Sequence, residues 1–269
     1  MEAIRGTDPG PWSGAAPRRS RGPCGHYRGP GMSVHRHPGR DDGRLRATSW
    51  RGDPTVAQVV VRARVTDAEV RALLDELRSR GCAAVVTAAL APPEQQPFLA
   101  AGFEEHERLH LLRRDVAPLP ARPDGVTLRR ARPADHPEVL AVDHLAFPPF
   151  WRFDEAALED ALDATPAVRF RVALRPGTSA VAGYAVTGRA GGRGYLQRLA
   201  VHPECQRRGL GTALVADGLR WLRRWGAREV LVNTQEANAG ALALYEALGF
   251  ARQPHGLAVL RRALAVGTP

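Results

Sequence analysis

Two stretches of this chain resemble each other at a constant spacing, and that repeat constrains the fold more than any other feature. VVTAALAPPEQQPFLAAGFEE in the first half aligns with LVNTQEANAGALALYEALGFAR in the second half at an offset of 147 residues. Phe98 then matches Tyr245, and Gly102 matches Gly249. An amphipathic helix and a glycine precede the strand in both copies. A repeat of this length indicates two copies of one structural unit.

The second copy belongs to a longer pattern that predicts a mixed α/β unit. VTLRRA is typical of a strand, and Pro133 suits the first turn of a helix that runs to about Leu145. DEAALEDAL predicts a second, shorter helix. The elements expected after it are the strands AVRFRVAL, AVAGYAVTGR and GYLQRLAV, a helix from about Arg208 to Trp225, the strand REVLVNT, a helix through Tyr245 that stops at Gly249, and two final strands near Phe250 and through LAVLRRAL. In the long helix, one apolar face is expected to contain Leu210, Leu214, Trp221 and Trp225.

The first half predicts a shorter version of the same pattern. VAQVVVRARV, from Val56, is rich in β-branched residues and predicts a strand. Thr66 and Glu69 form a capping-box pattern at the start of a helix that ends near Gly81. AAVVTAAL and FEEHERLHLLRRD predict two further strands. The linker VAPLPARPDG follows, and its three prolines mark a domain boundary.

The N-terminal residues 1–53 are rich in Gly, Pro, Arg and Ser and show neither helical nor strand periodicity. Such a stretch cannot bury enough apolar area to offset its ordering entropy, so we expect it to be disordered. Met1 and Met32 are both candidate start residues.

The net charge of +10 comes from arginine alone, since all 38 basic residues are arginine. The absence of lysine is typical of a coding bias in a GC-rich genome. Half of the excess charge lies in residues 1–53, and the remainder forms no long run of one sign. We therefore expect these arginines to be solvated surface, and a basic groove for a nucleic acid is the less favoured interpretation.

The sequence gives no support to a membrane span or a metal site. No apolar run approaches the roughly 20 residues that span a bilayer, and the first residues lack the apolar core of a secretory signal. We therefore expect a cytoplasmic protein. Cys24, Cys82 and Cys205 are far apart and have no partners at metal-ligand spacing, so we expect reduced thiols and no metal.

The segment QRRGLGTA, Gln206–Ala213, joins a strand to a helix and has the composition of a phosphate-binding turn. A nucleotide-hydrolase loop needs GxxxxGK[ST], and this chain contains no lysine. A dinucleotide fingerprint needs a third glycine where Leu214 stands and an acid at the end of the next strand, whereas Glu229 opens that strand. Two glycines before a helix N-terminus still favour an anion. A turn without any ligand is the alternative.

The longer segment LAVHPECQRRGLGTALV resembles motif A of the GNAT family of N-acetyltransferases, and NAGALALYEALGF resembles motif B of the same family. The resemblance extends from Val126 to about Leu264. It implies the α/β (α+β) fold of that family, a mixed twisted central sheet flanked by helices. It also implies that the turn binds the pyrophosphate of acetyl-CoA, the acetyl donor, through Gln206, Arg207, Arg208, Gly209, Leu210, Gly211 and Thr212.

The same resemblance implies further roles in the second half. The strand GYLQRLAV is expected to splay from REVLVNT, and backbone groups of Leu199 and Val201 are expected to hydrogen-bond the pantetheine arm in the gap. Asn238 matches a residue that hydrogen-bonds this arm, and it is equally suited to capping a helix. Tyr245 matches the catalytic tyrosine that protonates the departing thiolate, since a phenol with a pKa of about 10 stays protonated at neutral pH. A buried aromatic with its hydroxyl bonded elsewhere is the alternative for Tyr245.

No single residue stands out as the general base that an amine acceptor requires. Family members often carry a glutamate on the strand before motif A, but residues 195–198 read YLQR and contain no acid. Gln197 can orient a water but is not a strong base. Asp143, His144 and Asp154 lie in the segment expected to wall the acceptor site, within or beside the aromatic stretch HLAFPPFWRFD.

These patterns predict three segments. Residues 1–53 form a disordered tail, residues 54–118 form a degenerate half-GNAT unit with Phe98 in place of the tyrosine, and residues 119–269 form an N-acetyltransferase domain. The expected activity is transfer of an acetyl group from acetyl-CoA to an amine by direct attack in a ternary complex. The amine is a protein N-terminus, a lysine or a small molecule. A non-catalytic acyl-CoA-binding or regulatory module is the alternative, and a homodimer is compatible with the sequence.

Overall fold

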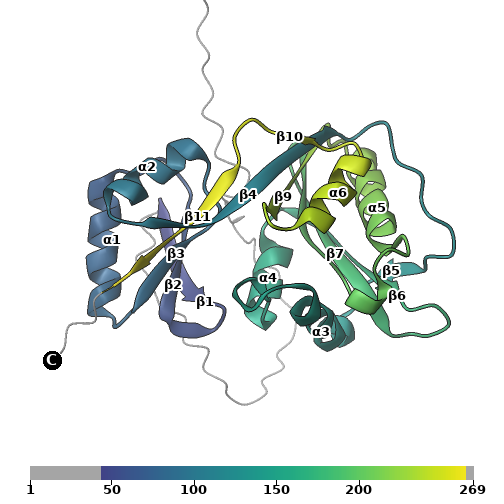
Figure 1. Cartoon of the computed structure of the whole chain (residues 1–269), viewed down its shortest axis with the longest axis horizontal. Helices are drawn as coiled ribbons and strands as arrows, with labels where there is room; N and C mark the ends of the chain where they lie inside the picture. The colour runs from purple at the N-terminus through teal and green to yellow at the C-terminus, as the bar shows by residue number, and fades with distance from the viewer. Residues whose placement is uncertain (1–43, 265–269) are drawn as a thin grey trace, which may run out of the picture.

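The computed structural model describes residues 44–264, which build one large mixed sheet with helices packed against it (Figure 1). The strands are β1 Leu45–Trp50, β2 Asp53–Val61, β3 Ala84–Thr87, β4 Glu104–Asp115, β5 Leu128–Arg130, β6 Ala167–Leu174, β7 Val181–Ala190, β8 Arg193–Val201, β9 Glu229–Gln235, β10 Ala251–Arg252 and β11 Leu257–Ala263. The α-helices are α1 Asp67–Ser79, α2 Pro92–Ala100, α3 His136–Ala146, α4 Glu155–Asp163, α5 Leu210–Arg224 and α6 Ala239–Ala247. Three short 3-10 helices are η1 Pro133–Asp135, η2 Pro149–Trp151 and η3 Pro203–Cys205.

The expected fold class is confirmed, because helices flank a sheet that mixes parallel and antiparallel pairs. The strand order is β1-β2-β3-β11-β4-β9-β8-β7-β6-β5, and β10 pairs with β4 off this path. In Figure 1, α1 and α2 lie with the first strands in one half of the molecule, and α3 to α6 lie in the other half. Strands β4 and β11 run side by side between the two halves.

The internal repeat is confirmed in three dimensions. Helix α2 and helix α6 correspond residue for residue at the offset seen in the sequence. The ring of Phe98 meets Phe103 edge-on at a centroid distance of 5.2 Å, and Tyr245 meets Phe250 in the same way at 5.7 Å. Strand pairing repeats as well, since β2 lies parallel to β3 and β8 lies parallel to β9. The two halves are therefore copies of one unit.

The last strand of each copy belongs to the sheet of the other copy. Strand β4, which follows α2, pairs antiparallel with β9 from Leu109 to Asp115. Strand β11, which follows α6, pairs antiparallel with β3 in the first half. The domain boundary predicted at residues 118 and 119 does fall in the linker after β4. The sheet, however, is continuous across both halves because these two strands are exchanged.

Each exchanged strand also carries an arginine to the helix of the other copy. Arg114 on β4 donates to the carbonyl of Leu248, at the end of α6 and beside Gly249. Arg262 on β11 lies against Gly102 in the corresponding turn after α2, where a Cβ would come within 2.7 Å of its Nη1. Arginine at a helix C-terminus satisfies carbonyl groups that have no partner within the helix. Arg114 thus reinforces the exchange at the end of α6, and Arg262 occupies the corresponding position after α2.

Two features of the sequence prediction differ from the structure. Residues 45–50, expected to belong to the disordered tail, form strand β1, because Leu45 and Ala47 alternate inward and Trp50, after a register shift, is also buried in the hairpin with β2. The rest of the predicted tail, residues 1–43, lies outside the described residues. Trp225, expected on the apolar face of the long helix, is 56% exposed because the helix ends before it. No helix within residues 44–264 is long and apolar enough to cross a membrane.

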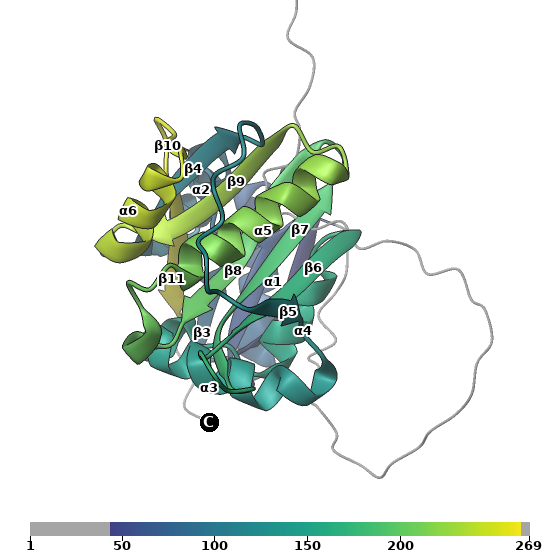
Figure 2. The same cartoon turned by 90° about the vertical axis from the view of Figure 1, so that its right-hand side faces the viewer.

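The linker between the halves crosses the outer face of α5 (Figure 2). Arg220 on α5 donates to the carbonyl of Pro120 at 3.0 Å. Pro123 then lies against the start of the same helix, since a Cβ on Gly209 would be 3.1 Å from the Cβ of Pro123. The linker therefore runs along α5 towards the turn that the sequence predicts to bind phosphate.

Candidate active site

The sheet opens between β8 and β9. These parallel strands pair over only three positions, from Arg193 to Tyr195 on β8. Beyond them β8 continues beside β7, and β9 continues beside β4. A β-bulge leaves Gln197 as an extra residue at the point of separation, a position where bulges commonly re-aim side chains next to active sites. The expected splay between these strands is confirmed.

An ion-pair cluster holds the closed end of this opening. The carboxylate of Glu229 on β9 accepts from Arg193 on β8 and from Arg113 on β4, each at 2.6 Å. Glu229, whose position at the start of its strand did not fit a dinucleotide fingerprint, thus links the adjacent strands β4, β9 and β8.

Two residues of β8, Leu199 and Val201, direct their backbone N–H and C=O groups towards the opening. The amide of His202 donates to the carbonyl of Ala182 at 2.8 Å, on the side of β7. Because backbone groups alternate along an antiparallel pair, those of Leu199 and Val201 face the opposite edge, where β9 has separated. The Val201 carbonyl accepts from the side chain of Gln206 at 3.3 Å. The amide of Val201 and both backbone groups of Leu199 remain directed at the opening.

Helix α5 begins beside the opening without a cap. Gly209 occupies the N-cap position with φ of 79°, has no side chain to accept from the helix, and is followed by no acid in the first turn. The first helical hydrogen bond runs from the Ala213 amide to the Gly209 carbonyl at 2.9 Å. The amides of Leu210, Gly211 and Thr212 precede it and have no carbonyl one turn earlier. Such a helix start favours an anion.

The corresponding helix of the first copy begins in the opposite way. At the start of α1, the Thr66 hydroxyl accepts from the Glu69 amide at 3.3 Å, and the Glu69 carboxylate accepts from the Thr66 amide at 2.7 Å. Asp67 adds a second acid to the first turn. This helix start is filled and negatively charged, so only the α5 copy is suited to a phosphate.

The turn before α5 is shaped by left-handed backbone and by two exposed arginines. Arg207 has φ of 60°, and with Gly209 it curves the chain so that successive N–H groups converge. Arg207 and Arg208 are exposed and pair with no carboxylate among residues 44–264. Gly211 serves packing as well, because a Cβ there would be 3.1 Å from the Leu244 side chain of α6. The predicted residues of this turn therefore lie together and fit a pyrophosphate.

Tyr245 lies on α6 in the buried cluster that also contains Leu196 of β8 and Val232 of β9, and it is 5% exposed. Burial raises the pKa of its phenol well above the ordinary value, and the positive charge of Arg198 offsets this only in part. No residue in the described range 44–264 hydrogen-bonds its hydroxyl. The alternative of a hydroxyl bonded elsewhere in the protein is thus not found, and the phenol holds its proton at neutral pH.

Asn238 caps helix α6. Its side-chain oxygen accepts from the Ala241 amide at 3.0 Å, which is the capping role proposed from the sequence. The side-chain nitrogen is a donor that this cap does not use. The structural role is therefore established, and contact with a pantetheine arm remains a prediction.

A buried ionic network lies behind β8 on the side of α3. Arg198 donates through Nε and Nη2 to the two oxygens of Asp143, each at 2.8 Å. Tyr184 donates its hydroxyl to Asp143 at 2.5 Å, and the Phe153 amide donates at 2.7 Å. The Arg198 guanidinium also stacks on the rings of Phe147 and Phe153, with its Cζ 3.5 and 3.9 Å from their centroids. This network fixes the aromatic loop against the sheet.

The three candidate bases of the sequence analysis all have structural partners. Asp143 is fully bonded in the network described above. His144 bonds the Phe153 carbonyl through Nε2 at 2.7 Å, and Asp154 caps α4 by accepting from the Ala157 amide at 2.7 Å. Gln197 leans towards β7, where a Cβ on Gly188 would be 2.8 Å from its carboxamide. The structure therefore gives none of them the position of a free base.

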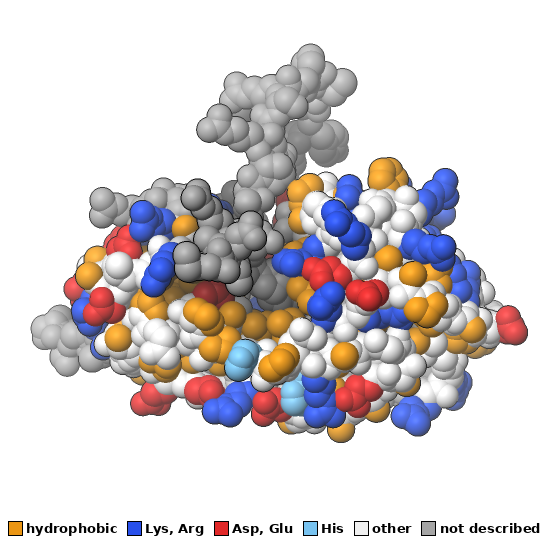
Figure 3. Space-filling view, turned by 90° about the horizontal axis from the view of Figure 1, so that it is seen from above, with side chains coloured by type: hydrophobic (Ala, Val, Ile, Leu, Met, Phe, Trp, Pro, Cys, Tyr) orange, Lys and Arg blue, Asp and Glu red, His pale blue; other side chains and the backbone are white. Residues whose placement is uncertain are grey.

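The first half of the chain packs against the aromatic loop that the sequence predicts to wall an acceptor site. Trp151 donates its indole N–H to Glu107 on β4 at 2.9 Å. The ring of Phe150 lies 4.9 Å from Trp50 of the first hairpin and 4.4 Å from His106 on β4. Figure 3 shows hydrophobic side chains gathered in the middle of the upper face, where the two halves meet. Sequence reasoning missed these first-half residues, because only the strand exchange brings them to the aromatic loop.

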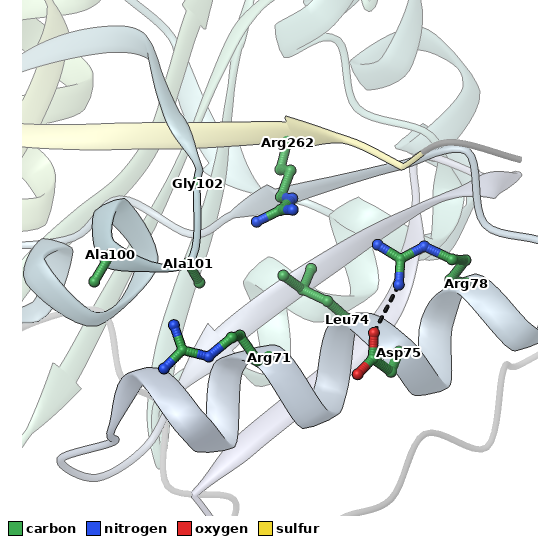
Figure 4. A pocket seen from close by; sticks show the side chains of 8 residues that line it. All are labelled: Arg71, Leu74, Asp75, Arg78, Ala100, Ala101, Gly102 and Arg262. Atoms are coloured by element: carbon green, nitrogen blue, oxygen red, sulfur yellow. Dashed lines mark hydrogen bonds and ion pairs between the residues drawn. The ribbon is translucent and has the colours of Figure 1, made fainter.

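A separate pocket of about 350 Å³ lies in the first half, between α1 and α2 (Figure 4). Its lining is basic, with Arg71, Arg78 and Arg262 around it, and Arg78 is paired with Asp75 at 2.6 Å. None of the residues predicted for the acetyl-CoA site lines it. Within residues 44–264, no group of three or more His, Cys, Asp or Glu side chains is placed to hold a metal.

The mixed sheet of this chain thus splits between two parallel strands beside an uncapped helix start. Residues 137–250 match the model of the family described as "Acetyltransferase (GNAT) family", so this part of the chain is a GNAT domain.

Similar proteins extend this assignment. The chain is 37% identical over 177 residues to the mycothiol acetyltransferase of Salinispora arenicola, covering 56% of this chain and 54% of that protein. It is 33% identical over 180 residues to that of Amycolatopsis mediterranei, covering 60% and 59%. The chain thus spans about half the length of the curated relatives it matches. A tandem GNAT protein from the clavulanic acid biosynthesis pathway has the same fold, with a TM-score of 0.61 at 17% identity, covering 86% of this chain and 82% of that chain.

Proposed function

We propose that this protein is an N-acetyltransferase that transfers an acetyl group from acetyl-CoA to an amine by direct attack in a ternary complex. The observation that carries the proposal is the opening between β8 and β9, with the uncapped start of α5 and the buried phenol of Tyr245 beside it. Acetyl-CoA, when bound, supplies the activated acetyl thioester.

The residues of the turn from Gln206 to Thr212 would bind the pyrophosphate. Its N–H groups and the partial positive charge of the α5 start attract the anion, and Arg207 and Arg208 add charge from unpaired side chains. The backbone of Leu199 and Val201 faces the opening, so it would hold the pantetheine arm as an extra strand would be held, and Asn238 at the start of α6 would add a side-chain hydrogen bond to the arm.

Two groups would act on the reacting atoms. Tyr245 keeps its proton because burial raises the pKa of the phenol, and it can give that proton to the leaving sulfur. A backbone amide of β8 at the opening can donate to the thioester oxygen, where negative charge develops during attack. The acceptor amine would approach from the side of the aromatic loop, between the two halves of the molecule.

The test is thioester cleavage measured by thiol release, with acetyl-CoA and a panel of amines. We expect turnover in the unaltered protein and a loss of about 10²–10⁴-fold in Tyr245→Phe, the range that a general acid contributes. Tyr195→Phe is the matched control, because Tyr195 lies in the closed, paired part of β8 and its change should leave turnover intact.

The alternative, a non-catalytic acyl-CoA-binding module, draws on the missing acid of β8 and on the engaged side chains of Asp143, His144 and Asp154. It predicts that acetyl-CoA stabilises the protein against heat while no amine is acetylated. Equal turnover in Tyr245→Phe and in the unaltered protein would contradict the role given to the phenol.

A further inference from the structure

Arg51 belongs to the first half of the chain but reaches the acceptor side of the second half. It lies in the turn between β1 and β2, where Trp50 pairs with Asp53 and the two residues between them have φ of 50° and 71°. Hairpin turns of this type favour glycine, asparagine or aspartate at both positions, so an arginine here is strained. Strained backbone of this kind tends to occur at functional sites.

Two aromatic rings hold the guanidinium of Arg51. Its Cζ lies 4.6 Å from the ring centroid of Trp50 and 4.7 Å from that of Phe153. The Phe153 ring also carries Arg198, whose Cζ is 3.9 Å from the same centroid. Nε and Nη1 of Arg51 are buried and have no hydrogen-bond partner within residues 44–264.

The nearby carboxylates are already engaged. Asp143 is bonded by Arg198, by the Tyr184 hydroxyl and by a backbone amide. One oxygen of Asp154 caps α4 at 2.7 Å from the Ala157 amide. In the described part of the chain, no carboxylate lies within ion-pair distance of Arg51. Burial, followed by the charge of Arg198, lowers the pKa of Arg51 to about 10, so the side chain is still a cation at neutral pH.

A guanidinium with buried nitrogens and no ion-pair partner within residues 44–264 is costly unless something supplies the missing charge. The planar fork of arginine matches a carboxylate with two parallel hydrogen bonds. The rings of Trp50 and Phe153 fix the plane of this fork and present apolar surface beside it. Arg51 thus has the geometry and charge of a binding group whose ligand is a planar anion.

We propose that Arg51 binds a carboxylate on the acceptor, so that the preferred acceptors are amino-carboxylates. This inference rests on the proposed acetyl transfer and adds a substrate class to it. The Phe153 ring contacts the guanidinium groups of both Arg51 and Arg198, and Arg198 stands on β8 next to Leu199, so the aromatic cluster that holds Arg51 lies against the strand that borders the opening. The amine would then meet the thioester while the carboxylate reaches across to the first half.

The test compares amines that differ only in the carboxylate. Straight-chain ω-amino acids of increasing length are paired with the alkylamines of equal length, and acetyl-CoA-dependent thiol release gives kcat/KM for each. We expect the amino acid to exceed its partner by at least about tenfold at the best length, the factor that a charge-assisted hydrogen bond supplies. Aminoalkylphosphonates form a third arm, because a phosphonate is an anion without the planar shape.

Variants then assign the preference to Arg51. In Arg51→Met the ratio of kcat/KM between amino acid and alkylamine should fall to about one. Arg46→Met is the matched control, because Arg46 is an exposed arginine on the same hairpin and its loss should leave the ratio unchanged. As a readout other than turnover, the N-acetylated amino acid together with CoA should raise the melting temperature of the unaltered protein more than that of Arg51→Met.

The outcomes separate the two proposals. Equal kcat/KM for both members of every pair in the unaltered protein would overturn the role of Arg51 while acetyl transfer stands, and this holds even if Arg51→Met does not fold. A preference for the phosphonate would overturn the carboxylate as the ligand. If none of the amines supported thioester cleavage, the proposed function itself would be refuted.

Discussion

Replacing Asp143 by asparagine is expected to destabilise the protein strongly, because the carboxylate neutralises a charge deep inside the second half. Asp143 is fully buried, and both of its oxygens accept from Arg198 at 2.8 Å. Asparagine has nearly the same shape but no charge, and its amide nitrogen would face a donor. Breaking a buried ion pair by removing one partner costs about 3–5 kcal/mol. That is a large share of the roughly 5–15 kcal/mol by which a folded domain is stable.

The assay is urea unfolding followed by circular dichroism and by tryptophan fluorescence. With a urea dependence of about 3 kcal/mol per molar, the midpoint of Asp143→Asn should fall by about 1–1.7 M. Glu246→Gln is the control, because Glu246 forms an equally short ion pair with Arg252 at 2.6 Å, but on the surface. An exposed pair contributes no more than about 1 kcal/mol.

A second variant tests whether the buried charge is the cause. Arg198→Met in the Asp143→Asn background removes the cation as well, so the double variant should recover part of the lost stability. The reasoning would be refuted if Asp143→Asn lost no more stability than Glu246→Gln. It would also be refuted if removing Arg198 made the single variant still less stable.

Three further outcomes are expected. Gly209→Ala and Gly226→Ala should each lose about 1–2 kcal/mol from positive φ at the two ends of α5, but only Gly209→Ala should weaken stabilisation by acetyl-CoA in a thermal-shift titration. Hydrogen bonds from Arg129 hold the pKa of Asp135 below its ordinary value, so its contribution to stability is present above about pH 3.8 and is lost as the pH falls further. Asp135→Asn should therefore flatten the acid limb of stability in urea titrations between pH 5 and pH 2. Arg114→Met should lower the free energy of unfolding by about 1.5–3 kcal/mol, since it removes the charged hydrogen bond that joins β4 to the Leu248 carbonyl in the other half.

The sequence predicted those parts of the fold that local interactions decide. The capping box at Thr66 and Glu69 marked the start of α1, and both bonds of that box are present. Gly249, with φ of 81°, ends the turn after α6 as expected of a glycine beyond a helix. The turn before α5 and the position of Tyr245 were also found, because their residues are close together in the chain.

The parts that the sequence did not reveal depend on contacts between distant segments. Nothing in the pattern of β4 says that its neighbours are β9 and β11, since any apolar strand of that length would satisfy the same alternation. β1 was missed because it is only six residues long, its alternation is broken by a register shift, and it follows a stretch rich in Arg, Gly and Pro. Arg51 and Glu107 were missed because they are first-half residues, and only tertiary structure brings them to the aromatic loop.

The exchange of last strands also bears on the order in which this protein can fold during synthesis. The amide of Leu260 on β11 donates to the hydroxyl of Thr87 on β3 at 2.9 Å, across a sequence separation of 173 residues. At about 5–20 residues per second, the ribosome needs roughly 10–35 seconds to make that intervening chain. Through that interval β3 has emerged without its neighbour, and its unpaired edge is open to other strands. The first half of this protein is therefore synthesised early, but its sheet is complete only after β11 has been synthesised and has paired with β3.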